Sequence, residues 1–259
     1  MKPLAIDLFC GLGGWTEGLL AEGYDVVGFD IEQHVYGEHR YPAQLVVQDV
    51  LTLHGSQFKD AALIVASPPC QEYSYMAMPW TRAKQIAREY RDGRRDVKKL
   101  TALFDACFRI QREASQAAGR HIPMVVENVR GAQPWVGRAR WSFGSFYLWG
   151  DVPVLMPPIS KAIKVPTMGA GWYPPGHPKH VPGLGFNTHA ERYTKNPGFR
   201  FDGSGRSFQS ESVNRHTTNG KGQNPDGRKS PARKFASAMI AKIPLPLSRH
   251  IAAIYGGAL

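Results

Sequence analysis

Cysteine is scarce in this sequence, and long apolar runs are absent. Only three cysteines occur among 259 residues, at positions 10, 70 and 107. An odd number at such wide spacing fits a reducing compartment better than a disulfide framework, and no two of them have metal-ligand spacing. No stretch reaches the roughly 18 to 20 apolar residues of a membrane span, and Asp7 interrupts the short apolar run near the N-terminus. We therefore expect a cytoplasmic protein without a signal peptide, a membrane segment or a metal site.

Acidic residues are also scarce, but only in one part of the chain. Residues 1–150 contain 17 Lys and Arg against 16 Asp and Glu, whereas residues 151–259 contain 15 against 5. The net charge of +11 therefore lies almost wholly in the last two-fifths of the sequence. A basic region of this kind favours a polyanionic partner, most simply nucleic acid. The alternative is a basic surface with no partner.

Apolar segments are abundant and fit one large α/β domain. Hydrophobic residues make up 42% of the chain, enough for a sizeable core. Their spacing predicts helices near 15–22, 32–40 and 96–118, and Cys107 lies on the apolar stripe of the last one, so we expect it in the core. Buried strands are expected at 3–9, 25–29, 45–47, 62–66 and 123–129. Such alternation predicts an α/β fold with a doubly wound, Rossmann-like parallel sheet.

The second part of the chain has a different composition. Residues 151–230 contain 11 Gly and 10 Pro and lack helical periodicity, so we expect loops and short strands there. The segment 233–259 returns to a helical pattern, and Pro244 or Pro246 would open its last helix. We therefore expect a domain at 1–150, a smaller irregular lobe at 151–232, and C-terminal helices at 233–259 that pack back on the first domain.

Residues suited to a nucleoside follow the first three expected strands. The glycine turn FCGLGG, residues 9–14, allows the backbone to approach a ligand closely. Asp30 ends the second strand about 20 residues on, where an acid suits the two hydroxyls of a ribose. Asp49 ends the third strand and could accept a hydrogen bond from an exocyclic amine. The glycine spacing differs from a dinucleotide fingerprint and favours a ligand without a pyrophosphate, and the alternative role of each acid is a helix N-cap.

A thiol and an acid follow the fourth and fifth expected strands. In ASPPCQEYSY, residues 66–75, two prolines stiffen the backbone before Cys70, which suits a thiol held in a definite direction; the alternative is a turn with a buried cysteine. Glu127 at a buried strand end would be costly unless it is paired or protonated, so it either pairs with Arg130 or acts as an acid toward a ring nitrogen. Arg138 and Arg140 alternate on an expected strand and either hold a phosphate or carbonyl or face solvent.

Taken together, these motifs resemble the cytosine-5 DNA methyltransferase family. The matching pieces, in order, are DLFCGLGG, Asp30, Asp49, PPCQEYS, ENV and RAR, followed by IPLPLSRHIAAIY near the C-terminus. The likeness covers roughly residues 5–143 and 233–255. It resembles the compact members of the family, of the kind found in phages and restriction-modification systems.

The resemblance implies both the reaction and the residues that carry it. Cys70 would add to carbon 6 of a cytosine flipped out of duplex DNA, and Glu127 would hydrogen-bond ring nitrogen 3. Carbon 5 would then take the methyl group of S-adenosylmethionine to give 5-methylcytosine. Arg138 and Arg140 complete the expected catalytic set, and one of them would supply the electropositive setting that a thiolate needs. The expected cofactor site consists of Phe9, Gly11, Gly13, Asp30, Ile31, Asp49, Val50, Pro69 and Lys242.

By the same resemblance, residues 151–232 form the target recognition lobe, and Gln71 and Ser74 lie in a catalytic loop that closes over the flipped base. Arginines of the lobe would fork onto guanine edges, whereas lysines would meet phosphates. We expect a monomer that binds duplex DNA. Its expected DNA-binding residues are Gln71, Ser74, Arg192, Arg200, Arg206 and Arg215.

The sequence departs from the family pattern at three places. Val136 stands where a glutamine is usual, and Ile31 follows the ribose acid where an aromatic residue is common. Ile240 and Ala241 replace a usual Gly-Asn pair, and Lys242 follows them. A lysine there could pair with the extra carboxylate of carboxy-S-adenosylmethionine, which would give a carboxymethylated cytosine. Two further hypotheses are cytosine-5 methylation of RNA and a catalytically decayed DNA-binding protein.

Overall fold

The computed structural model describes residues 2–71, 73, 80–143, 146–156, 234–235, 238–239 and 241–256. The chain divides into two compact units, Met1–Pro157 with Ile243–Leu259, and Pro158–Lys242. Most of the second unit lies outside the described residues, and so does most of the lobe expected at 151–232. All the named helices and strands belong to the first unit.

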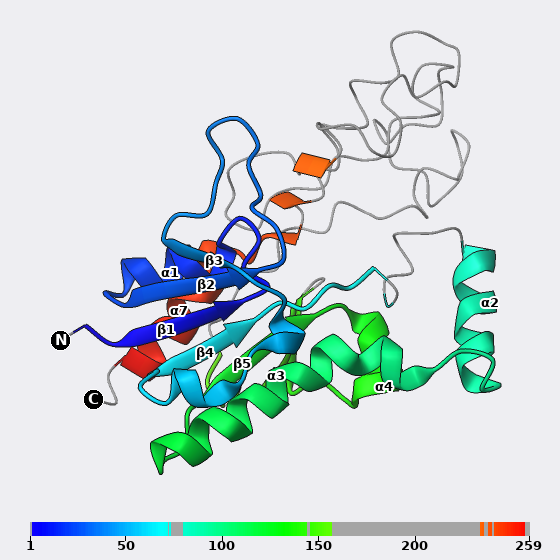
Figure 1. The fold of residues 1–259 in the computed structure, drawn as a ribbon. Coiled ribbons are helices and arrows are strands. Elements are labelled where there is room, and N and C mark those ends of the chain that lie inside the picture. The colour runs from blue at the N-terminus through cyan, green and yellow to red at the C-terminus, as the bar shows by residue number, and fades with distance from the viewer. Residues whose placement is uncertain are drawn as a thin grey trace, which may run out of the picture. The chain divides into compact units, whose positions relative to one another are not determined.

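A seven-stranded sheet with the order β3-β2-β1-β4-β5-β7-β6 lies at the centre of the first unit (Figure 1). Strands β1 to β5 are parallel, and β7 and β6 join them as antiparallel strands. The doubly wound α/β fold predicted from the sequence is confirmed. Strand β2 lies beside β1 on one side, and β4 lies beside it on the other, so the strand order reverses at β1. Open α/β sheets bind ligands at the carboxyl ends of the strands next to such a switch point. The strands are β1 (Leu4–Leu8), β2 (Asp25–Asp30), β3 (Gln44–Val47), β4 (Leu63–Ala66), β5 (Met124–Asn128), β6 (Trp141–Phe143) and β7 (Phe146–Gly150).

Helices cover both faces of the sheet (Figure 1). Helix α3 (Val97–Ala118) lies on one face, and α1 (Gly14–Ala21) and α7 (Leu245–Gly256) lie on the other. Helices α1 and α7 pack so closely that a Cβ added to Gly18 would lie 2.3 Å from Ser248 Oγ. No helix in the described part of the chain is long and apolar enough to cross a membrane. The shorter helices are α2 (Trp80–Arg91), α4 (Gln133–Val136), η1 (Val50–Thr52), η2 (Gly55–Phe58) and η3 (Arg130–Ala132).

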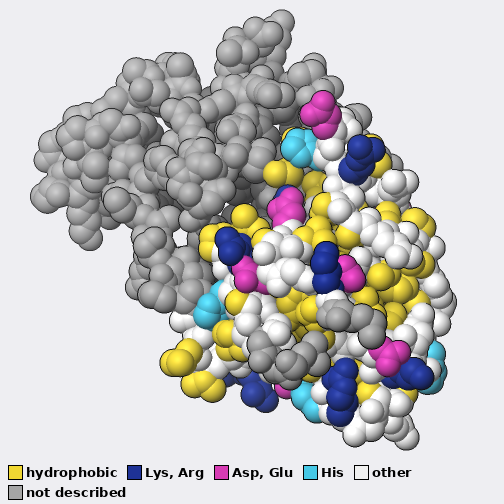
Figure 2. Space-filling view, turned by 90° about the vertical axis from the view of Figure 1, so that its left-hand side faces the viewer, with side chains coloured by type: hydrophobic (Ala, Val, Ile, Leu, Met, Phe, Trp, Pro, Cys, Tyr) yellow, Lys and Arg dark blue, Asp and Glu magenta, His cyan; other side chains and the backbone are white. Residues whose placement is uncertain are grey.

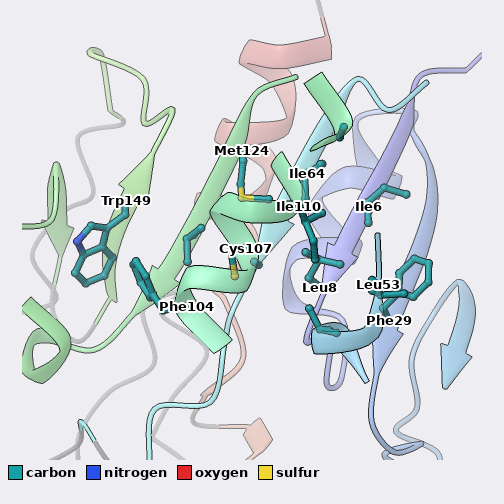
Figure 3. Packing of buried hydrophobic residues seen from close by; sticks show 14 of the residues in the cluster. Ile6, Leu8, Phe29, Leu53, Ile64, Phe104, Cys107, Ile110, Met124 and Trp149 are labelled. Carbon is teal, nitrogen blue, oxygen red and sulfur yellow. The ribbon is translucent and has the colours of Figure 1, made fainter. Parts of the chain in front are cut away.

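The main core lies between the sheet and α3. Side chains alternate between the two faces of a strand, so every second residue of β1, β4 and β5 points toward α3. Cys107 of α3 is fully buried, and Figure 3 shows its sulfur among the apolar side chains of the cluster. The core position expected for Cys107 is therefore confirmed. The residues that meet there include Ile6, Leu8, Ile64, Met124, Phe104, Ile110 and Trp149.

The prediction of a helix at 32–40 is wrong. All residues between β2 and β3 are described, and they contain no helix; an isolated bridge joins Tyr36 to His39. The physical reason is tertiary: Tyr41 is buried over Gly28, where an added Cβ would lie 2.3 Å from the Tyr41 ring. This connection packs onto the sheet through the Tyr41 side chain and not through the apolar face of a helix.

Two other elements differ from expectation. Helix α2 was not foreseen: its residues are mostly polar, and the helical spacing of its few apolar residues, such as Ala83, Ile86 and Tyr90, was missed. The segment around residues 138–150 forms a hairpin of β6 and β7, and β6 begins only at Trp141. Helix α7 begins at Leu245, so Pro244 precedes it and Pro246 lies in its first turn, as the helical pattern predicted.

Candidate active site

The glycine loop after β1 brings a backbone donor to Asp30 at the end of β2. The Gly11 N–H donates to Asp30 Oδ2 over 2.9 Å, while Oδ1 faces Glu32 N at 3.4 Å and His34 Nε2 at 3.5 Å. Burial alone would raise the pKa of Asp30, but hydrogen bonds from His34 and from the Gly11 N–H hold that pKa below its ordinary value. Asp30 is therefore a buried carboxylate at neutral pH, and its Oδ1 keeps room to accept a hydrogen bond from a ligand.

The same loop is open at one glycine and closed at another. Phe9, Gly11 and Gly13 all have positive φ, at 58°, 51° and 77°. A Cβ added to Gly11 would meet nothing within 4 Å, whereas one added to Gly13 would lie 2.5 Å from Pro42 Cδ. The backbone at Gly11 can therefore approach a ligand closely, and Gly13 is required by the packing of the loop itself.

The three other residues expected near the nucleoside end have different surroundings. Asp49 accepts the Leu51 N–H on Oδ1 at 2.9 Å and so caps η1. The helix N-cap, which the sequence left open as an alternative role for this acid, is therefore observed. Val50 is buried in the core, whereas Ile31 is 71% exposed at the end of β2. Asp49 and Ile31 can therefore present side chains to a ligand, and Val50 can present only its backbone.

Pro68 and Pro69, here called the proline platform, are held to both neighbouring strands. The Ser67 N–H just before them donates to the last carbonyl of β1 over 3.1 Å. Asn128 Nδ2 donates to the Pro68 carbonyl over 3.0 Å, and this asparagine is only 1% exposed. Cys70 therefore follows a segment whose backbone is fixed by proline rings and by hydrogen bonds to β1 and β5.

Cys70 is a free, partly exposed thiol. Burial raises its pKa above the ordinary value, and the nearby Glu127 raises it further. The arginine that was expected to favour the thiolate is not among the groups that shift this pKa. The thiol is therefore protonated at neutral pH and must lose its proton before it can attack a substrate.

Glu127 is a buried acid in β5, on the strand beside the one that leads to Cys70. Burial raises its pKa to about 8, and a hydrogen bond with Ser67 offsets only part of that effect. Arg130 is not among the groups that shift this pKa, so the alternative role in a local ion pair receives no support. A carboxyl that is neutral near pH 7 can donate a proton to a ring nitrogen.

The two expected catalytic arginines lie on the approach to β6 and not on a strand. Both Arg138 and Arg140 are exposed. The Arg140 N–H donates to the Leu148 carbonyl over 2.8 Å, so the backbone pairing of the hairpin extends to this residue although β6 itself starts at Trp141. The expectation that the two arginines alternate on a strand is therefore wrong, because the chain leaves α4 through Gly137 before pairing resumes.

The remaining predicted residues lie partly inside and partly outside the described part of the chain. Pro69 and Gln71 are exposed beside Cys70. Lys242 is partly exposed and belongs to the second unit. The face shown in Figure 2 has acidic and basic side chains interspersed with hydrophobic ones, in keeping with the near-neutral charge of residues 1–150. Outside the described residues lie Ser74, Arg192, Arg200, Arg206 and Arg215.

A buried polar cluster beneath the glycine loop was missed by sequence reasoning. Asp7 in β1 is 1% exposed, and its Oδ2 accepts the Thr16 hydroxyl over 2.6 Å. Thr16 Oγ1 also lies 2.6 Å from the Tyr41 hydroxyl, and Asp7 Oδ1 has no hydrogen-bond partner among the described residues. Burial raises the pKa of Asp7 to about 7. The available signal was an acid inside the apolar strand PLAIDLF.

The arrangement joins two kinds of chemistry on neighbouring strands. The ends of β1 and β2 supply an open glycine backbone and the Asp30 carboxylate, which suit the hydroxyls of a nucleoside. The ends of β4 and β5 supply the Cys70 thiol and the neutral Glu127 acid, which suit covalent addition to a ring and protonation of it. Among the described residues, no group of three His, Cys, Asp or Glu side chains could hold a metal ion.

Comparison with known proteins gives one family. Residues 4–131 match the family model described as C-5 cytosine-specific DNA methylase. No curated protein matches the chain.

Several solved structures are also similar to part of the chain. One is a DNA modification methyltransferase encoded within an E. coli prophage, with 24% identity over 51% of this chain and 33% of that one, at a TM-score of 0.30. A second is the Dnmt2 methyltransferase of S. pombe, with 16% identity over 52% of this chain and 37% of that one, at a TM-score of 0.32. A third is the methyltransferase EhMeth of Entamoeba histolytica, with 17% identity over 52% of this chain and 41% of that one, at a TM-score of 0.31. The matched part spans only about a third to two-fifths of those chains.

Proposed function

We propose that this chain, whose residues 4–131 match the model of the C-5 cytosine-specific DNA methylase family, transfers a methyl group from S-adenosylmethionine to carbon 5 of cytosine in duplex DNA. The observation that carries the proposal is the neighbourhood of Cys70 and Glu127. A free thiol on the proline platform lies beside a buried acid that stays neutral near pH 7. That pair matches what activation of a cytosine ring needs.

Activation begins with the thiol. Carbon 5 of cytosine is a poor nucleophile, and addition of the Cys70 sulfur to carbon 6 turns the ring into an enamine with electron density at carbon 5. Glu127 hydrogen-bonds and protonates ring nitrogen 3, which receives the electron pair displaced by the addition. After carbon 5 has been methylated, its proton passes to solvent. The Cys70 thiolate then leaves and nitrogen 3 returns its proton to Glu127, which restores the aromatic ring.

The proline platform and Asn128 act by orientation. They fix the backbone before Cys70 relative to β1 and β5, so thiol and acid approach the same ring from neighbouring strands. A base within a duplex cannot be reached by such a pair, and the target cytosine therefore has to be flipped out of the helix. We assign Gln71 and Ser74 to contacts with the flipped nucleotide and with the gap that it leaves in the duplex.

The cofactor site that we assign is the crevice of β1 and β2. Bound S-adenosylmethionine supplies an electrophilic methyl group on a sulfonium centre. The open backbone at Gly11 and the spare acceptor of Asp30 fit its ribose, and Phe9, Gly13, Ile31, Asp49, Val50 and Pro69 complete the proposed site. Lys242 is included because of its place in the C-terminal motif, where it is also the basis for the carboxylated cofactor as an alternative.

Duplex DNA is the proposed substrate because the net charge of +11 lies almost wholly in residues 151–259. Arg192, Arg200, Arg206 and Arg215 are the proposed base-reading residues of a target recognition lobe at 151–232. Methylation of RNA by the same chemistry is the second candidate, and a decayed DNA-binding protein is the third.

The decisive experiment is a nucleoside mass analysis. Mixed-sequence duplex DNA and total tRNA are incubated separately with the protein and S-adenosylmethionine, and Cys70→Ser is run in parallel. We expect 5-methylcytosine in the DNA with the wild type only. Modified tRNA with unmodified DNA would replace the DNA assignment by RNA. A product only with carboxy-S-adenosylmethionine would change the cofactor, and no product in any arm would favour the decayed protein.

A further inference from the structure

A tryptophan in α1 is linked through a serine to the buried acid of the site. Trp15 is 2% exposed, and its indole Nε1 donates to Ser67 Oγ over 3.0 Å. Ser67 in turn neighbours Glu127, and its side chain acts to lower the pKa of that acid. Trp15 directly follows the glycine loop, so the link runs from the proposed cofactor side of the crevice to the proposed catalytic acid.

The register of the sheet explains why these side chains meet. Strands β4 and β5 are parallel with Ala66 opposite Val126, so the next residues, Ser67 and Glu127, also lie opposite each other. Ala66 and Val126 belong to the core cluster under α3. Because side chains alternate along a strand, Ser67 and Glu127 point to the other face, which is the face that α1 covers (Figure 1). The link therefore follows from the backbone pairing.

The chemistry of the three groups sets the direction of the link. An indole N–H can only donate, so the Ser67 oxygen accepts it. The hydroxyl hydrogen of Ser67 then remains for donation to Glu127, and a hydroxyl that accepts one hydrogen bond donates the next one more strongly.

We propose that Ser67, oriented by Trp15, is a positioning residue that fixes which oxygen of Glu127 carries the proton. The oxygen that accepts the Ser67 hydroxyl is the carbonyl oxygen of the neutral acid. Its proton therefore resides on the other oxygen, which is free to donate to ring nitrogen 3 of the target cytosine. The inference rests on the proposed function, because it assigns the proton within the step proposed for Glu127.

Few other groups act on this acid. Of the titratable groups in the described part of the chain, Cys70 is the one whose charge is coupled to Glu127, from the segment after β4. From β7, the residue paired with Glu127 is the apolar Leu148. From α1, the contribution is the neutral indole of Trp15 through Ser67. Arg138 and Arg140, on the segment before β6, are exposed and are not among the groups that shift the pKa of Glu127.

The first test is a direct titration of Glu127 without any substrate. The protein is labelled with ¹³C at glutamate carboxyls, and the Glu127 signal is assigned by its absence in Glu127→Gln. Ser67→Ala should raise the pKa of Glu127 by about one unit, because a donor to the carboxylate is removed. Trp15→Phe should raise it in the same direction by about half as much. An unchanged pKa in Ser67→Ala would overturn the inference, and so would a lowered one, which would mean that Ser67 accepts the proton of the acid.

Two controls separate the link from general effects on packing. Trp149 is a second buried tryptophan whose indole N–H donates to a backbone carbonyl, that of Gly137, over 2.9 Å. Trp149→Phe should leave the pKa of Glu127 unchanged, although it removes the same kind of hydrogen bond from the core. Ser67→Thr keeps the hydroxyl and should restore the wild-type pKa, whereas failure of this rescue would count against the proposal.

Kinetics provide the second readout. In single-turnover methyl transfer, Ser67→Ala should lower the maximal rate about tenfold with little change in the affinity for cofactor, and Ser67→Thr should recover most of the loss. A loss of cofactor affinity at an unchanged maximal rate would contradict a role in placing the proton. If the wild type methylates no cytosine, the proposed function fails, while the titration still decides whether Ser67 donates to Glu127.

Discussion

Asp30 and Glu127 are both buried carboxyls on parallel strands of one sheet, yet their pKa values move in opposite directions. Asp30 has a lowered pKa, because donors from Gly11, Glu32 and His34 outweigh the effect of burial. Glu127 has a pKa raised to about 8, because burial outweighs its hydrogen bond with Ser67. Burial and the number of donors aimed at each carboxyl therefore together decide which acid is charged.

This difference suits Asp30 and Glu127 to different roles in the proposed site. A carboxylate that stays ionised accepts hydrogen bonds from ribose hydroxyls, whereas a neutral carboxyl can give a proton away. Both roles depend on groups that fold against the strands from elsewhere in the chain. Variants that change the donors or the acids therefore test whether the two carboxyls differ in protonation and in role.

The largest effect is expected for Glu127→Gln, which keeps the shape of the side chain but cannot supply a proton. The rate of single-turnover methyl transfer should fall by about 10² to 10⁴-fold, measured by rapid quench with labelled cofactor. Binding of the cofactor should be unchanged, because Asp30 and the glycine loop are untouched. A rate within tenfold of the wild type would show that Glu127 is not the proton donor.

A smaller effect, on stability, is expected for Asp7→Asn. Asp7 has a single donor, Thr16, and burial raises its pKa from 3.8 to about 7. The folded protein therefore holds this proton more tightly than the unfolded chain, so the stabilisation is complete below about pH 4 and is lost as the pH rises through 7. Removing the titrating group should remove on the order of 2 to 4 kcal/mol from the change in unfolding free energy between pH 4 and pH 8.

Urea unfolding at a series of pH values measures that change. The exposed Asp25, which pairs with Lys2 at the surface, provides the matched control, and Asp25→Asn should leave the pH dependence as it is. If Asp7→Asn kept the wild-type pH dependence, the raised pKa of Asp7 would be refuted.

The smallest effect is expected on the cofactor side. Asp30→Asn should weaken binding of S-adenosylmethionine about 10- to 100-fold by calorimetry, because charge-assisted hydrogen bonds to the ribose are lost. The maximal rate at saturating cofactor should change little. His34→Ala is the control: it removes only one of the donors to Asp30, so the acid stays ionised at pH 7.5 and the affinity should change by no more than about threefold. Equal losses in both variants would mean that His34 itself contacts the cofactor.

Much of the fold was readable in the sequence because its signals are local. The five parallel strands are short apolar runs, each ending at or just before a residue of the proposed site, and α3 follows a clear apolar stripe with Cys107 on it. The failed helix at 32–40 shows the limit. The return of Tyr41 over Gly28 depends on a contact that no local pattern announces.

The candidate site was foreseen as a set of strand ends, but its internal connections were not. Asn128 holds the Pro68 carbonyl and Trp15 holds Ser67 across more than 50 residues of sequence, so neither contact leaves a local signal. Asp49 shows the converse case. It caps η1, as the simpler interpretation held, and it also lies just after the carboxyl end of β3, where the proposed cofactor site is.

The sequence by itself determined where the five parallel strands lie along the chain and which residues follow them, because apolar runs, glycine and proline act on the neighbouring backbone. Only the tertiary structure decided the protonation of those residues. Asp7, Asp30 and Glu127 are all carboxylic acids on one sheet, yet one is ionised and two hold protons near neutral pH. Burial and the count of hydrogen-bond donors made that choice, and both depend on side chains that only folding brings together.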